Sequence, residues 1–190
     1  MIFNPHLELK GKHALFSASN YHWINYDVEK MREVYGRHLA TLRGTQLHNL
    51  AAECIHLGVN LPSSKKTLNM YVNDAIGYRM IPEQPLFYSN NFFGTTDAIS
   101  FRKKLLRIHD LKTGLNPASM NQLRIYAALY CLEMGMKPDK INTELRIYQN
   151  NEIEVETPHP DDVGEIMNKI VLFDNEISRM KEEGGFYGEE

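Results

Sequence analysis

Two prolines that lie close together, Pro82 and Pro85, divide the chain into a helical first part and a strand-rich second part. Before them, apolar residues recur at three- and four-residue steps over 27–39, 42–57 and 67–80, which is typical of helices. Proline lacks a backbone N–H and clashes with the preceding turn, so helix formation is expected to stop here. Strand-like runs follow over 86–89, 94–101 and 105–112.

The remaining sequence adds a helix, two strands and a last helix. Asn116-Pro117 predicts a helix start, with asparagine as the cap and proline at the first helical position. This helix, over 117–136, is apolar around most of its circumference and should be largely buried. Alternating residues predict strands over 141–148 and 152–156, and a helix follows from Pro158 to about Lys181. The order of elements predicts a mixed α/β fold around a small sheet.

Charge is divided unevenly along the chain of 190 residues. Residues 1–150 carry 18 Lys and Arg against 12 Asp and Glu, whereas residues 151–190 carry 3 against 12. We expect a single domain over 1–190, with a core at about 15–150 and an acidic C-terminal helix and tail over 151–190. The two cysteines are too few for an iron–sulfur cluster, which takes four thiolates. No secretory signal or membrane-spanning run is visible, so we expect a cytoplasmic protein without a membrane partner.

A hairpin around Lys103-Lys104 would bring two carboxylates together. A reversal there pairs residues whose numbers sum to 207, so that Asp97 faces Asp110. Opposed acids repel unless a cation lies between them, and oxygen ligands suit Mg²⁺ or Mn²⁺. Lys112 follows on the same face, where its ammonium can reach a metal-bound water or a phosphate. The pattern predicts metal-assisted phosphodiester hydrolysis, and the alternative is an ordinary Asp110–Lys112 ion pair with Asp97 capping a turn.

Several short motifs occur in an order that resembles the RecB-like branch of the PD-(D/E)xK nuclease superfamily. Gly94-Thr95-Thr96-Asp97 and Asp110-Leu111-Lys112 resemble its second and third motifs. Gly44 to His48 resembles its Gly-x-x-x-His helix, and Gln122 to Tyr126 resembles its Gln-x-x-x-Tyr helix. The resemblance covers about residues 15–150 and also includes Ser17-Ala18-Ser19 and Glu83.

The resemblance implies a restriction-endonuclease-like core of order α-β-β-β-α-β, with a helical N-terminal region and a C-terminal helix. It implies Mg²⁺ or Mn²⁺ and no iron–sulfur cluster. The implied metal ligands are His48, Asp97, Asp110 and the backbone carbonyl of Leu111. The implied catalytic residues are Asp97, Asp110, Lys112, Gln122 and Tyr126. Glu83 is equally consistent with a supporting role at the metal and with a turn residue, and the other histidines, His109 among them, are expected to be ordinary core or surface residues.

The implied function is hydrolysis of DNA by a free-standing, phage-type nuclease, located in the host cytoplasm if phage-encoded. An exonuclease acting on DNA ends in recombination, repair or phage DNA processing is favoured over an endonuclease. The alternatives are a non-catalytic DNA-binding or recombination-partner protein on a nuclease fold, and a phosphodiesterase acting on RNA. Arg43, Lys65 and Lys66 are the predicted DNA contacts. The resemblance also allows a homo-oligomer or a single-strand annealing or binding protein as partner.

Overall fold

The computed structural model describes residues 4–183 and forms two compact units, Met1–Arg43 and Gly44–Glu190. The first contains two short 3₁₀ helices, η1 (Leu7–Leu9) and η2 (Tyr21–Asn25), and the beginning of the long helix α1 (Val28–Leu57). Within it, Trp23 Nε1 donates a hydrogen bond to the Ser17 carbonyl at 2.8 Å. The second unit contains the sheet and the candidate site. A single domain over 1–190 stays a prediction.

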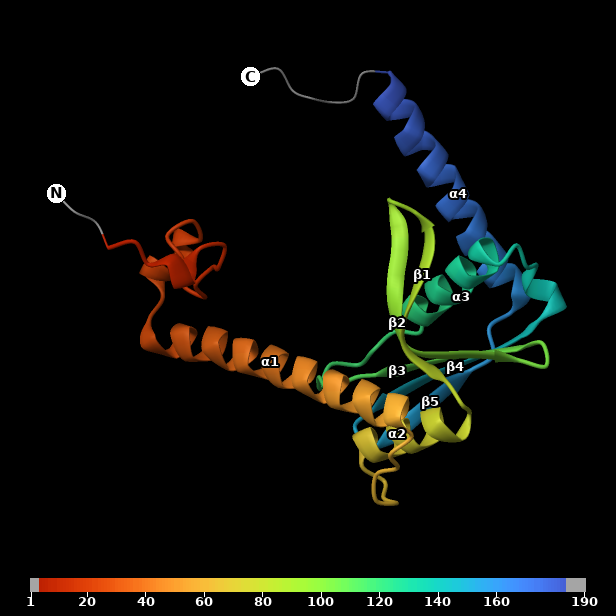
Figure 1. Ribbon diagram of the computed structural model, residues 1–190. Coiled ribbons are helices and arrows are strands. Elements are labelled where there is room, and N and C mark those ends of the chain that lie inside the picture. The colour runs from red at the N-terminus through yellow and green to blue at the C-terminus, as the bar shows by residue number, and fades with distance from the viewer. Residues whose placement is uncertain (1–3, 184–190) are drawn as a thin grey trace. The chain divides into compact units, whose positions relative to one another are not determined.

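A five-stranded mixed sheet forms the centre of the second unit (Figure 1). Its strands are β1 (Ile81–Ser89), β2 (Phe92–Arg102), β3 (Leu105–Leu111), β4 (Asn142–Gln149) and β5 (Glu152–Glu156), and they lie side by side in this order. All neighbours are antiparallel except β3 and β4, which are parallel because the chain crosses over through α3 (Asn121–Glu133). With α2 (Thr67–Gly77) and α4 (Pro160–Glu182), the described chain has four α-helices, and the α/β prediction is confirmed.

The predicted register of the central hairpin is confirmed. Ala98 pairs with His109 and Arg102 pairs with Leu105, so paired numbers sum to 207 throughout the β2–β3 ladder. Lys103 and Lys104 form the two-residue turn, with φ of 50° and 62°. Left-handed φ at both central positions is what a type I′ hairpin requires, and lysine adopts it only at some cost. The Asp97–Asp110 position lies one step beyond the last paired residues.

Helices pack on both faces of the sheet. On one face, α3 packs over alternate core residues of β3 and β4, among them Leu106, Ile108 and Leu145. On the other, α2 and the end of α1 enclose the intervening residues Leu111 and Tyr148. The site lies where these two layers meet the end of the sheet. None of the helices in the described range 4–183 has both the length and the apolarity needed to cross a bilayer.

Three predicted boundaries were wrong. Strand β1 begins at Ile81 and contains both prolines, which an edge strand tolerates because the missing N–H is not needed for a second neighbour. Helix α1 runs without a break across the two predicted helices. Helix α3 begins at Asn121, after the predicted cap at Asn116. The end of the predicted acidic tail, 184–190, lies outside the described residues.

Candidate metal centre

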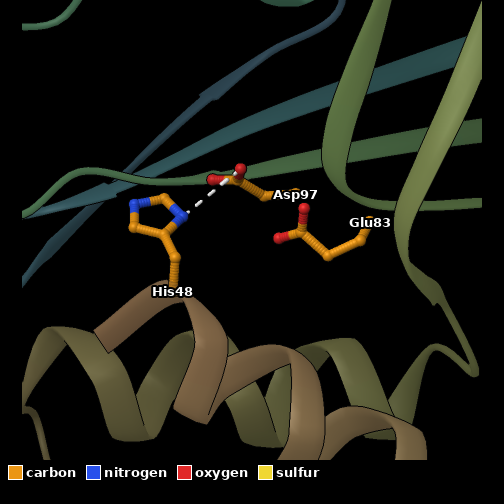
Figure 2. Close-up of side chains that lie close together, drawn as sticks. All are labelled: His48, Glu83 and Asp97. Atoms are coloured by element: carbon orange, nitrogen blue, oxygen red, sulfur yellow. Dashed lines mark ion pairs between the residues drawn. The ribbon is translucent and has the colours of Figure 1, made fainter. Parts of the chain in front are cut away.

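His48, Glu83 and Asp97 converge from three elements (Figure 2). One ligand atom from each lies within 4.8 Å of the other two. His48 points from α1 toward the sheet, and its Nδ1 lies 3.4 Å from Asp97 Oδ1 of β2. Glu83 comes from β1, where its neighbours Pro82 and Gln84 pair with Ala98 and Thr96 on either side of Asp97. The two carboxylates therefore lie at opposed positions of adjacent strands.

The backbone of Glu83 is strained. Its φ is 51°, in the left-handed region that a residue with a long side chain seldom adopts inside a strand. Such conformations cost about 1–3 kcal/mol and are concentrated at functional sites. Burial, followed by the negative charge of Asp97, raises the pKa of the Glu83 carboxyl. The raised pKa indicates that burial and the neighbouring carboxylate of Asp97 disfavour the charged form of Glu83.

A third carboxylate, that of Asp110, lies near this cluster but outside the 4.8 Å group. Its side chain is only 3% exposed, and burial, followed by the charge of Asp97, raises its pKa. Asp97 is fixed by β3, because the Leu111 N–H donates a hydrogen bond to Asp97 Oδ2 at 2.8 Å. The backbone of Leu111 therefore orients a predicted metal ligand. Ligation by its carbonyl stays a prediction.

His48 is placed by a close approach of α1 to the loop that follows β3. A Cβ at Gly44, one helical turn before His48, would lie 2.9 Å from Thr113 Oγ1, so the contact needs glycine. A hydrogen bond with Asp97 raises the pKa of the imidazole, and the charges of Asp97, Asp110 and Glu83 add to the effect. The Gly-x-x-x-His spacing therefore has a structural reason that is independent of any resemblance.

Lys112 links Asp110 to helix α3. Its Nζ lies 2.9 Å from Asp110 Oδ2 and donates a hydrogen bond to Gln122 Oε1 at 2.8 Å. Gln122 in turn donates to the Tyr126 hydroxyl at 3.1 Å. A Cβ at Gly94 would lie 2.9 Å from the Tyr126 ring, so glycine is also required where β2 passes α3. The predicted set Asp110, Lys112, Gln122 and Tyr126 is therefore one connected chain of side chains.

The donor set fits a divalent cation. The group within 4.8 Å consists of one imidazole and two carboxylates, with the carboxylate of Asp110 nearby but outside that group, and carboxylate oxygens are the ligands that Mg²⁺ and Mn²⁺ prefer. Asp110 Oδ2 is buried and accepts no hydrogen bond from the described residues, since Lys112 approaches it as an ion pair in poor hydrogen-bonding geometry. Buried charged oxygens normally have partners, and a cation would supply the missing one.

The predicted DNA contacts are not brought to this centre by any contact among the described residues. Lys65 and Lys66 lie exposed in the loop between α1 and α2, and Arg43 is exposed in the first unit. Arg107, which lies near the hairpin turn, forms an ion pair with Glu144 at 3.0 Å. The sequence did not decide between a role at the metal and a turn position for Glu83. Its position opposite Asp97 follows from the β1–β2 register, which could not be predicted because Pro82 and Pro85 indicated a loop.

A second polar network lies on the other face of the sheet. His109 is fully buried, and its Nδ1 is 3.2 Å from the Tyr148 hydroxyl, which donates to Asp74 Oδ2 at 2.7 Å. Arg146 binds Asp74 at 3.3 Å and Glu144 at 3.0 Å. Burial, with the charges of Arg146 and Arg107, lowers the pKa of His109 to about 3. Here two acids, Asp74 and Glu144, face two arginines, Arg107 and Arg146.

Comparison of the chain with protein-family models, with curated proteins and with solved structures finds no match. The placement of the chain in a nuclease family is accordingly a proposal that depends on the residues and the geometry above.

Proposed function

We propose that this protein is a Mg²⁺- or Mn²⁺-dependent deoxyribonuclease with a PD-(D/E)xK core of the RecB-like kind. The observation that carries the proposal is the meeting of His48, Glu83 and Asp97 within 4.8 Å, beside the buried pair Asp110–Lys112. Three carboxylates, of which only Asp110 is fully buried, lie near one lysine and one histidine, and such an excess of negative charge favours a bound cation. The element order through α1, β1–β3, α3 and β4 agrees with the core that the resemblance implies.

Each residue of the site has a separate role in the proposed hydrolysis. His48, Glu83, Asp97 and Asp110 would hold the metal, which supplies a water of lowered pKa and a positive charge against phosphate oxygens. Lys112 would position that water and stabilise the negative charge that develops on the phosphate. Gln122 accepts a hydrogen bond from Lys112 and is itself held by Tyr126, so the ammonium is aimed before substrate binds.

The substrate that we propose is DNA, attacked from an end. The basic balance of residues 1–150 suits a polyanion, and Lys65 and Lys66 are exposed cations of the same unit as the site. A role in recombination, repair or phage DNA processing follows only from the resemblance, as does a single-strand annealing or binding protein as partner. A bound metal that is lost on chelation is a required property of this function.

The experiment compares four substrates: linear and closed-circular DNA, each single- and double-stranded, with Mg²⁺, with Mn²⁺ and with a chelator. We expect metal-dependent loss of linear DNA and persistence of closed circles, because an exonuclease needs an end. Cleavage of closed circles would correct the assignment to an endonuclease. Cleavage of none of the four, together with retained DNA binding, would instead establish a non-catalytic DNA-binding protein. An RNA strand of the same sequence tests the remaining alternative.

A further inference from the structure

The exposed face of the β1–β2 hairpin leads directly away from the proposed metal centre. Along β1 the exposed residues alternate, Glu83, Pro85 and Phe87, and along β2 they are Phe93 and Thr95. Phe87 pairs with Phe93, and Pro85 pairs with Thr95, so these side chains form two cross-strand rows. The aromatic row lies four residues from Glu83, or about 13 Å along the strand.

The two phenylalanines are unusually exposed for such large apolar side chains. Phe87 is 50% exposed and Phe93 is 67% exposed, although they are directly opposed in the ladder. Their neighbours are not free: Leu86 belongs to the core with α3, and Gly94 lies against the Tyr126 ring. The hairpin is therefore anchored on its inner face by the same tyrosine that holds Gln122 near Lys112. We name Phe87 and Phe93 the aromatic pair.

The hairpin residues between Glu83 and Asp97 carry no charged side chains. Between Glu83 and Asp97, residues 84–96 include no Asp, Glu, Lys or Arg. The hairpin's own side chains thus offer no cation for phosphate, and the carboxylates that contact it, Glu133 and Asp174, accept hydrogen bonds from Phe87 N–H, Ser89 and Asn91. Aromatic rings without charge recognise the faces of nucleobases, a contact that tolerates every base because each has a π-face.

On the basis of the proposed function, we infer that the aromatic pair stacks on unpaired bases next to the phosphate held at the metal centre. Bases inside a duplex present no free face, so this surface selects single strands or ends with unpaired nucleotides. The surface is continuous with the metal centre through Pro85 and Thr95, and its separation from Glu83 corresponds to a few nucleotides of an extended strand. The inference adds a substrate class that the metal centre alone does not define.

The test uses the single tryptophan of the chain. In a Trp23→Phe background, Phe93→Trp places a tryptophan in the aromatic pair, and Phe173→Trp places one at an exposed position of α4 as the matched control. Emission is measured with a single-stranded oligodeoxythymidine and with a blunt duplex, in Ca²⁺ without Mg²⁺. Stacking predicts quenching of the residue 93 tryptophan by the single strand, little by the duplex, and none in the control.

The affinity for the same single strand provides a second readout. Phe93→Ala should weaken binding by about 5- to 100-fold, the effect of losing one stacked base, and Phe93→Tyr should restore it where Phe93→Leu does not. The slope of log affinity against log salt should stay that of the parent protein, because stacking releases no counterions. An unchanged affinity in Phe93→Ala, or a changed salt slope, would overturn the inference.

The inference and the proposed function can fail separately. Cleavage that requires Asp110 but is unaffected, like binding, by substitution of Phe93 would refute the stacking inference and support the proposed nuclease function. Quenching in Phe93→Trp and weakened binding in Phe93→Ala, with no cleavage by the parent protein, would support the stacking surface and refute the nuclease function. If the emission of the Phe93→Trp protein changed with protein concentration in the absence of DNA, a second copy of the chain would be the occupant and the stacking inference would be wrong.

Discussion

Two neighbouring residues of β3, His109 and Asp110, begin two polar networks on opposite faces of the sheet. Each contains a buried side-chain atom without a hydrogen-bond partner among the described residues, His109 Nε2 and Asp110 Oδ2. On the His109 face the charges balance, with Asp74 and Glu144 against Arg107 and Arg146. On the other face, the carboxylates of Glu83, Asp97 and Asp110 lie near one another, and the ion pairs among the described residues bring them Lys112 and His48 as counter-charges. One network is balanced in charge, and the other is the proposed cation site.

The unpartnered atom has a different meaning on each face. Tyr148 donates its proton to Asp74, so it accepts from His109 Nδ1, and the proton of the neutral imidazole lies on that nitrogen. His109 Nε2 is then a neutral lone pair, which is inexpensive to bury. Asp110 Oδ2 belongs to a carboxylate, whose burial costs far more. Charge balance, and not burial alone, therefore distinguishes the supporting network from the proposed metal site.

The largest expected effect separates the two faces with one kind of substitution. Asp110→Asn should reduce metal-dependent DNA cleavage below detection while leaving the metal-free protein equally or more stable, because it removes repulsion with Asp97. Asp74→Asn, the matched variant, should lower the free energy of unfolding and keep cleavage. Cleavage assays and urea unfolding of both proteins measure this. Loss of activity in both variants with equal loss of stability would mean that the two networks have the same role.

Lys112→Ala should cut single-turnover cleavage by roughly 10²- to 10³-fold, the scale of one lost electrostatic stabiliser, and keep DNA binding within a few-fold. Lys112→Arg should not restore the rate, because a planar guanidinium cannot occupy the position that Gln122 and Asp110 define for an ammonium. Lys140→Ala, at the exposed pair with Asp139, is the control and should leave the rate unchanged. A fully active Lys112→Ala protein would show that Lys112 has no role in catalysis and serves only as an ion-pair partner of Asp110.

On the balanced face, Arg146→Met should lower the free energy of unfolding by about 2–3 kcal/mol, because Asp74 and Glu144 lose a shared, largely buried partner. Arg124→Met, which breaks the more exposed pair with Glu156, should cost no more than about 1 kcal/mol. Urea denaturation of the two variants gives the comparison. Equal costs would show that the Arg146 network contributes no more than a surface ion pair.

The sequence predicted the centre better than its surroundings. The β2–β3 register followed from local alternation and a two-residue turn, so the relative positions of Asp97, Asp110 and Lys112 could be predicted from the sequence. The contact of Gln122 with Lys112 could be expected only through the resemblance. Glu83 was hidden because prolines suggested a loop, and its left-handed backbone has no sequence signature. Tyr78 and Tyr148, which contact the His109 ring, lie more than 30 positions away in the chain, and no local pattern joins them.

An effect on stability of similar size to that of Arg146→Met is expected from the bound metal. Mn²⁺ at 100 times its Kd should add about 2.7 kcal/mol to the free energy of unfolding, which corresponds to an increase in Tm of about 5–10 °C. Chelation should reverse the increase, and Asp97→Asn should abolish it. Thermal denaturation with and without Mn²⁺ measures the effect. An identical increase in Asp97→Asn would locate the stabilising metal elsewhere.

Direct titration with Mn²⁺ tests the central claim, that the unbalanced network is a cation site and the balanced one is not. Calorimetry of the parent protein should show saturable binding that Asp110→Asn weakens by at least about 100-fold, since a buried carboxylate ligand is lost. Asp74→Asn should bind Mn²⁺ as the parent protein does. Absence of binding by the parent protein, or equal affinity in the parent and Asp110→Asn proteins, would contradict the account.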